Sequence, residues 1–157
     1  QKGLTSDACI TSVDFMPTLL GLLGLAIPSR VEGTNLSHLA LSQSGSQPEF
    51  AFMQGAGATA SWAEGHEWRA VRDKQYTYAK YRISKTDTAQ ELLFHHAADP
   101  YQMTNLIADE KHQAALSQLR TQLTQKMKSV SDNFEPSTWF RDHCTDGNRV
   151  ILRGARG

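Results

Sequence analysis

Two runs of alternating side chains, separated by only two residues, constrain the fold of this chain more than any other feature. Residues 67–72 and residues 75–83 each alternate between two sets of side chains, as a half-buried strand does. The intervening Asp73-Lys74 is short enough for a tight turn. Because two strands joined by a tight turn can only pair side by side in opposite directions, the pattern predicts an antiparallel hairpin.

Two further strands and one helix extend this unit. Residues 50–54 and 91–95 are predicted strands, and Asp109 is placed to cap a helix over residues 110–130. The apolar positions of that helix form a one-face stripe made of Leu116, Leu119, Leu123, Met127 and Val130. The predicted fold class is therefore α+β, with a small antiparallel sheet packed against one amphipathic C-terminal helix.

An earlier helix is predicted over residues 12–25, with Ser12 as its cap and Gly24 near its end. It is apolar on almost every face, which predicts a buried helix rather than one lying on a surface. Residues 26–48 are rich in loop-forming residues, with a short helical turn predicted at 36–41. In the tail, residues 148–153 are a candidate last strand.

Charge and hydropathy exclude several classes of protein. Sixteen basic residues balance sixteen acidic ones among 157 residues, so the chain lacks the net positive charge of nucleic-acid-binding and membrane-surface proteins. No apolar run approaches the roughly 20 residues of a membrane span.

The first residues contain neither a hydrophobic signal segment nor an initiator methionine, and we expect the chain to begin inside a longer gene product.

The cysteines and histidines predict no metal site within the chain. Cys9 and Cys144 are far apart and neither belongs to a C-x-x-C pair, so two buried free thiols are expected. His95 and His96 are adjacent on a predicted strand, where neighbouring side chains point to opposite faces. No catalytic nucleophile motif is present either, and we expect no catalytic residue in this chain.

One cluster of residues stands out as a candidate substrate-binding site. Trp62, His66 and Trp68 lie close together around Gly65, and Arg69 follows directly. Aromatic rings flanked by polar groups are good platforms for sugars, and the arginine fork suits a sulfate or a carboxylate. The alternative is that the tryptophans anchor the loop to the core.

Four segments, in order, resemble the C-terminal portion of a type I sulfatase of the alkaline-phosphatase superfamily. Residues 11–20 read TSVDFMPTLL, close to that family's S-V-D-F-x-P-T-L-L, and residues 68–72 read WRAVR before two tyrosines. Residues 91–94 read ELLF where the family has E-L-Y-D, and residues 99–106 read DPYQMTNL, similar to D-P-x-E-x-x-N-L. The resemblance covers about residues 7–130 and departs from the family at Phe94, His95 and Gln102.

The resemblance implies a division of labour along the chain. Residues 1–48 would end the N-terminal α/β sulfatase domain, so that the first helix belongs to that missing domain. Residues 49–130 would form the C-terminal subdomain, and residues 131–157 a tail. The formylglycine nucleophile and the divalent cation, calcium, would lie upstream, and this chain alone would be inactive.

The resemblance also implies partners and a location. The partners would be the missing N-terminal domain and a sulfate-ester substrate, with a homo-oligomer through exposed apolar surface as a further expectation. A periplasmic or secreted location follows from the family. Two alternatives stay open: the C-terminal part of a related phosphodiesterase or phosphonate hydrolase, and a non-catalytic structural or binding module.

Overall fold

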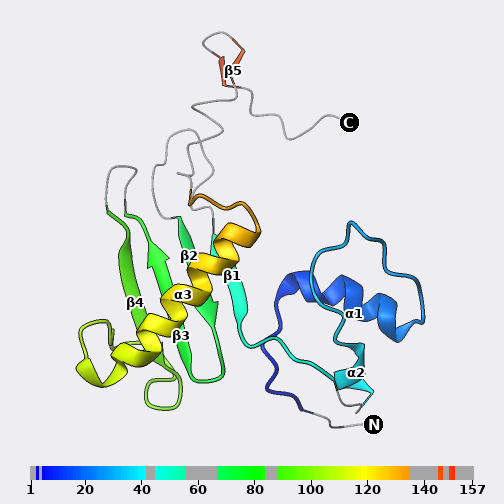
Figure 1. Ribbon diagram of the computed structural model, residues 1–157, viewed down its shortest axis with the longest axis horizontal. Coiled ribbons are helices and arrows are strands. Elements are labelled where there is room, and N and C mark those ends of the chain that lie inside the picture. The colour runs from blue at the N-terminus through cyan, green and yellow to red at the C-terminus, as the bar shows by residue number, and fades with distance from the viewer. Residues whose placement is uncertain are drawn as a thin grey trace.

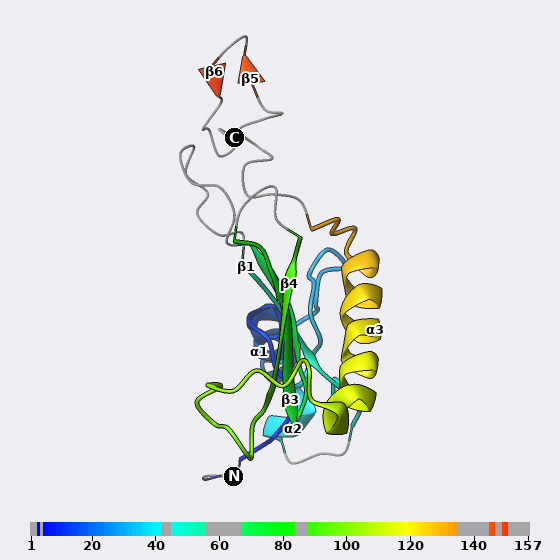
Figure 2. The same cartoon turned by 90° about the vertical axis from the view of Figure 1, so that its left-hand side faces the viewer.

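The computed structural model describes residue 3 and residues 5–41, 45–55, 67–83, 88–134, 145–146 and 149–150, the last four by their backbone. A four-stranded antiparallel sheet in the order β1-β2-β3-β4 carries the long helix α3 on one face (Figures 1 and 2). The elements are η1 Ser12–Asp14, α1 Phe15–Leu22, α2 Ser37–Ala40, β1 Ala51–Gly55, β2 Trp68–Arg72, β3 Tyr76–Tyr81, β4 Gln90–His95, η2 Glu110–His112, α3 Gln113–Ser129, β5 Thr145–Asp146 and β6 Arg149–Val150. The predicted α+β class is confirmed.

The predicted hairpin is formed by β2 and β3, which pair antiparallel with Val71 opposite Tyr78. Its turn is fixed by Asp73, whose carboxylate accepts the backbone N–H groups of Gln75 at 2.7 Å and Tyr76 at 2.6 Å. Such side-chain acceptance is the reason that aspartate favours turns. The predicted strands at 50–54 and 91–95 are β1 and β4, each shifted by one residue at one or both ends.

The core lies between the sheet and α3. Three sheet residues and three helix residues are at most 1% exposed and pack together: Val71, Tyr78, Leu93, Leu116, Leu119 and Leu123. The helix begins as predicted, because the Asp109 carboxylate accepts the backbone N–H of Lys111. Val130 was wrongly assigned to the stripe. It lies beyond the last helical residue and is 45% exposed, so the stripe ends with the partly buried Met127.

A polar group inside this interface also joins the helix to the sheet. The Tyr78 hydroxyl donates to the carboxylate of Glu91, which in turn accepts Arg120 Nε at 3.0 Å and Nη2 at 2.5 Å. The bonds from Arg120 hold the pKa of Glu91 below its ordinary value. Burial, followed by the adjacent carboxylate, raises the pKa of Tyr78 well above its ordinary value. The Tyr78 hydroxyl therefore stays protonated and donates to Glu91, and the Glu91 carboxylate is paired with the charged Arg120.

The first helix begins at Ser12 as predicted, but its capping residue is one position earlier than predicted. Thr11, not Ser12, is the N-cap of η1, because the Asp14 carboxylate accepts both the N–H and the hydroxyl of Thr11, at 2.7 and 2.9 Å. The same carboxylate accepts the N–H of Thr34 and so holds the following loop against the helix start. The helix ends at Leu22, before the predicted residue 25, and Gly24 follows with a φ of +65°, which favours glycine. The short helix predicted at 36–41 is α2.

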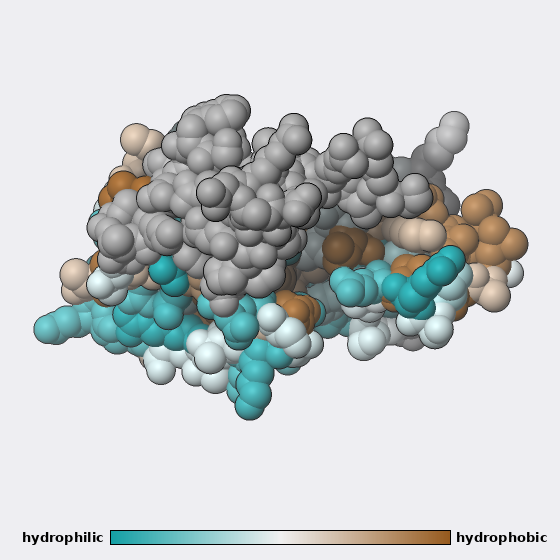
Figure 3. All heavy atoms as spheres, turned by 90° about the horizontal axis from the view of Figure 1, so that it is seen from above, coloured by the Kyte–Doolittle hydropathy of each residue, from teal (hydrophilic) through white to brown (hydrophobic). Residues whose placement is uncertain are grey.

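The apolar side chains of α1 are exposed within the described residues, as expected for a helix predicted to be buried only against a domain that this chain does not contain. The exposed side chains around η1 and α1 are Val13, Phe15, Met16, Leu19, Leu22, Leu23 and Leu25. They gather at one end of the molecule, seen in brown at the right of Figure 3. We call these seven residues the α1 surface. They form a contiguous exposed apolar patch rather than single scattered residues, and such patches mark interaction sites. In the described part of the chain, no helix is long and apolar enough to cross a membrane.

Replacing Leu119 with alanine should lower the free energy of unfolding by about 2–5 kcal/mol, because a cavity would open in the six-residue core. Urea unfolding of the chain measures this. The matched control is Gln118→Ala, one position earlier on the exposed side of the helix, which should change stability by no more than about 0.5 kcal/mol. Equal effects of the two substitutions would contradict the assignment of the stripe to the core.

Replacing Glu91 with glutamine should flatten the acid limb of the stability profile. Since the folded-state pKa of Glu91 is lowered, its contribution is present above the unfolded pKa, about 4.3, and is lost as pH falls through the folded value. Unfolding measured from about pH 6 down to about pH 2 tests this. The control Glu32→Gln changes an exposed loop carboxylate and should leave the slope as it is.

Candidate functional site

The predicted site lies at the end of the sheet where β1 ends and β2 begins. Trp62 and His66 belong to the segment between these strands and lie outside the described residues. Trp68 and Arg69 are the first two residues of β2, and the alternation of the strand sends their side chains to opposite faces. The structure therefore does not bring Trp68 and Arg69 together on one surface.

Trp68 forms an exposed aromatic surface at this end. It pairs with Gly55 on β1 and Tyr81 on β3, and it is 38% exposed. Its indole lies over Gly55 so closely that a Cβ atom at that position would collide with the ring. Glycine is required at position 55 because the tryptophan occupies the space above it.

Arg69 is turned inward and is bound to the protein itself. Its Nε and Nη2 atoms form a bidentate ion pair with the carboxylate of Asp132, the second bond measuring 3.1 Å. Its Nη1 atom donates to the backbone oxygens of Gly55 at 3.2 Å and Trp68 at 3.0 Å. In this structure the arginine fork that suits an anionic ligand is filled by a carboxylate of the same chain. A contact between Arg69 and substrate stays a prediction.

Asp132 is ionised as the partner of Arg69. Burial by itself would raise the pKa of this carboxyl, but the bonds from Arg69 and from the N–H of Phe134 outweigh burial and leave the pKa below its ordinary value. The pair is nearly enclosed, with each side chain about one-tenth exposed. Breaking such a pair leaves an uncompensated charge, so it holds its two segments firmly together.

The ring of Phe134 contacts the guanidinium groups of two arginines, Arg69 and Arg82. Its ring centroid lies 5.2 Å from the Arg69 guanidinium carbon and 4.8 Å from that of Arg82, within the range of cation–π attraction. Arg82 also donates to the Phe134 carbonyl oxygen at 3.2 Å. We call Arg69, Arg82, Asp132 and Phe134 the arginine clamp.

The arginine clamp contacts the strand ends on either side of residues 56–66, which themselves lie outside the described residues. Through Gly55 and Trp68 it holds the residues near both ends of that segment, and through Asp132 and Phe134 it holds the chain that follows α3. Sequence analysis missed Arg82, Asp132 and Phe134. The contact between Arg69 and Asp132 spans 63 positions, and no local pattern marks so distant a pair.

The described residues show no metal cluster, and their cysteine and their paired histidines lie away from the clamp. No group of three or more His, Cys, Asp or Glu residues in the described ranges is arranged to hold a metal ion. Cys9 is a buried free thiol whose pKa is raised by burial, while Cys144 lies outside the described residues. His95 stacks edge-on against Tyr76, and His96 bonds to Thr77, so the two histidines do diverge.

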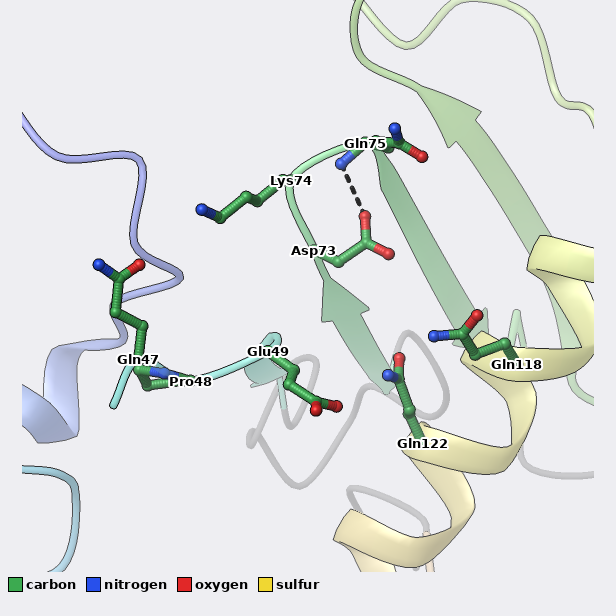
Figure 4. Close-up of a pocket in the computed structure, with 8 residues that line it drawn as sticks. All are labelled: Gln47, Pro48, Glu49, Asp73, Lys74, Gln75, Gln118 and Gln122. Atoms are coloured by element: carbon green, nitrogen blue, oxygen red, sulfur yellow. Dashed lines mark hydrogen bonds between the residues drawn. The ribbon is translucent and has the colours of Figure 1, made fainter. Parts of the chain in front are cut away.

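A polar cavity of about 520 Å³ lies at the other end of the sheet (Figure 4). It is bordered by the β2–β3 turn, the segment before β1 and the exposed side of α3, and its lining residues are Gln47, Pro48, Glu49, Asp73, Lys74, Gln75, Gln118 and Gln122. The length of β2 separates it from Trp68. It is therefore distinct from the predicted site.

Two curated relatives resemble most of this chain. An ulvan-active sulfatase of Formosa agariphila is 31% identical over 140 residues, which cover 89% of this chain and 26% of the relative. An endo-4-O-sulfatase of Bacteroides thetaiotaomicron is 32% identical over 142 residues, covering 80% of this chain and 27% of the relative. The chain thus spans about a quarter of the length of the curated relatives it matches.

Solved structures share the fold. A structure described as a 2-O GAG sulfatase has a TM-score of 0.71 at 22% identity, over 85% of this chain and 28% of that one. A phosphonate monoester hydrolase of Agrobacterium radiobacter has a TM-score of 0.53 at 21% identity, over 90% of this chain and 28% of that one.

The sequence profile of one family matches residues 1–129, and that family is described as N-sulphoglucosamine sulphohydrolase, C-terminal. The match covers the first helix, the whole four-stranded sheet and α3. The chain belongs to this family of sulfatase C-terminal regions.

Proposed function

We propose that the full-length protein hydrolyses sulfate esters of glycans and that this chain supplies structural support and one wall of the substrate cleft. The match of residues 1–129 to the sulfatase C-terminal family carries this proposal. The glycan class is favoured because the matched relatives are an ulvan-active sulfatase and an endo-4-O-sulfatase. A periplasmic or secreted location is part of the proposal, since polymeric glycans are found outside the cytoplasm.

We propose that the catalytic groups lie upstream of residue 1. The described residues offer neither a nucleophile motif nor a cluster of metal ligands, so calcium and formylglycine would both belong to the N-terminal domain. There, the cation and neighbouring basic groups would neutralise the charge on the transferring sulfate. What this chain's own residues would do is bind and orient the glycan.

The proposed boundaries place residues 1–48 in the N-terminal domain, residues 49–130 in the C-terminal subdomain and residues 131–157 in a tail. Packing supports the first boundary, because α1 contacts η1 and α2, whereas α3 packs on β2 and β3. The uncovered α1 surface is then an internal surface of the longer protein. A homo-oligomer formed through the same surface is the competing explanation for its exposure.

The cleft wall would be built on the 56–66 segment, with Trp62, His66 and Trp68 as sugar platforms. The arginine clamp holds both ends of that segment, and a binding loop needs such a rigid base. Arg69 would act mainly through this anchoring. A sulfate contact by Arg69 would first require its exchange from Asp132.

The alternative of a phosphonate hydrolase shares the fold, as the similarity to the Agrobacterium enzyme illustrates. The two reactions are separated by assaying the full-length protein on a sulfate monoester and on a phosphonate monoester. Preference for the phosphonate would contradict the proposed function.

The 157-residue chain alone should not hydrolyse an aryl sulfate, while the full-length protein should. Both are assayed at equal concentration, with and without a chelator. Chelator-sensitive turnover by the short chain would show that the catalytic groups lie within it.

Replacing Trp62 or His66 with alanine in the full-length protein should raise KM for a sulfated oligosaccharide. Loss of one stacking contact, worth about 0.5–1.5 kcal/mol, corresponds to a rise of roughly 2- to 12-fold. The maximal rate on a small aryl sulfate should stay nearly unchanged, because only binding to the sugar is lost.

Thermal unfolding of the same variants separates this role from simple anchoring. If the side chains only pin the loop to the core, Tm falls and KM stays as it was. The control Gln125→Ala, on the exposed side of α3, should change neither quantity.

A further inference from the structure

The polar cavity beside the β2–β3 turn has no part in the proposed function (Figure 4). Three parts of the chain that are distant in sequence form it, namely the segment before β1, the turn itself and α3. The proposed boundary at residue 48 runs along its edge, since Pro48 lies on one side of that boundary and Glu49 on the other. Ligand sites are common where two parts of a protein meet, and a volume of about 520 Å³ is within the usual range of small-molecule sites.

Hydrogen bonds within the protein hold the walls of this cavity in place. The Asp73 carboxylate accepts the backbone N–H groups of Gln75 and Tyr76, which fixes the turn. The Gln75 carbonyl oxygen accepts the N–H of His96 at 2.8 Å and so joins the turn to the end of β4. On the other side, α3 is held by its buried leucines. The cavity is therefore formed before any ligand arrives, which lowers the entropic cost of binding.

One amide in the cavity wall has an unpaired oxygen. The Oε1 atom of Gln122 is buried, and none of the described residues donates a hydrogen bond to it. Figure 4 shows Gln118 and Gln122 extending from α3 toward the space that they border with Asp73. A buried oxygen without a donor is unfavourable, and the last torsion of a glutamine side chain is soft. The Gln122 amide therefore gains free energy by turning to meet a donor within the cavity.

The charges around the cavity oppose an anionic ligand. Glu49 and Asp73 contribute two carboxylates to its lining. The lysine among the lining residues is Lys74, whose ammonium group is bound to the Asp7 carboxylate at 2.9 Å. In Figure 4 its side chain extends away from α3. A sulfate or a carboxylate placed here would face two like charges and a lysine that is already paired.

Side-chain amides make the cavity suitable for hydroxyl groups. The amides of Gln47, Gln118 and Gln122 each offer two N–H donors and an acceptor oxygen, beside the carboxylates, which only accept. A sugar hydroxyl donates and accepts at once, so it can pair with both kinds of group. An ammonium ligand has donors only and would leave the amide N–H groups unpaired, while an apolar ligand would leave every polar group unpaired.

We propose that this cavity binds a neutral saccharide, whose hydroxyl groups contact Gln118 and Gln122. The site is separate from the candidate site, because the length of β2 lies between the cavity and Trp68. Binding at the cavity follows from its own chemistry and does not require the proposed function. If the full-length protein does act on a polymeric glycan, an unsulfated part of that polymer held here raises the effective concentration of the rest at the catalytic groups.

Titration of the full-length protein with the neutral sugars cellotetraose, chitotetraose and neoagarotetraose tests the site. Saturation-transfer NMR detects binding, and calorimetry gives Kd. We expect binding of at least one sugar, weakened about 5- to 10-fold by Gln122→Leu because the hydrogen bonds of the amide are lost. The matched control Gln125→Leu makes the same change on the exposed side of α3 and should leave Kd unchanged. Gln118→Ala, expected above to preserve stability, is the second cavity variant and decides the outcome if Gln122→Leu does not fold.

Each other outcome overturns the proposal. If none of these sugars binds, the cavity holds water alone. Binding that is unchanged in the cavity variants would place the sugar elsewhere on the protein. Tighter binding of the diamine putrescine than of any sugar, lost in the same variants, would assign the cavity to cations. Turnover of a small aryl sulfate, expected to be equal in all variants, is measured in parallel and reports on the proposed function separately.

Discussion

The packing of α3 across one face of the sheet is the interaction on which the rest of the structure depends. Three leucines of the helix meet Val71, Tyr78 and Leu93, and Arg120 adds an ion pair to Glu91 across the same interface. Apolar burial provides most of the driving force, while the polar triad fixes the orientation of the helix because its partners must face one another. The strand ends that carry the candidate site are held in place by this interface.

The arginine clamp connects the end of the helix to the strands that carry the candidate site. Asp132 follows the end of α3 by three residues, so the ion pair with Arg69 couples the helix end to the start of β2. The bonds from Arg69 to Gly55 and Trp68 then join the end of β1 to the start of β2. The charge that sequence analysis assigned to substrate is used here for internal structure, and a buried arginine needs such a partner.

The α1 surface remains uncovered by the described residues when the internal contacts have been formed, and this agrees with the membership of the chain in a family of sulfatase C-terminal regions. Exposure of its apolar side chains to water is unfavourable, and α3 does not cover them because it is packed on β2 and β3. One curated relative extends well beyond the part that this chain matches, which covers 26% of it.

Local patterns in the sequence determined the hairpin, the helix over 110–129 and the family. Alternation, the Asp73 turn, the Asp109 cap and the leucine stripe each depend on residues within a few positions of one another, which is why they can be recognised without coordinates. Only the tertiary structure decided the partner of Arg69 and the role of Phe134. Those outcomes depend on segments tens of residues apart meeting in space, and no periodicity in the sequence encodes that meeting.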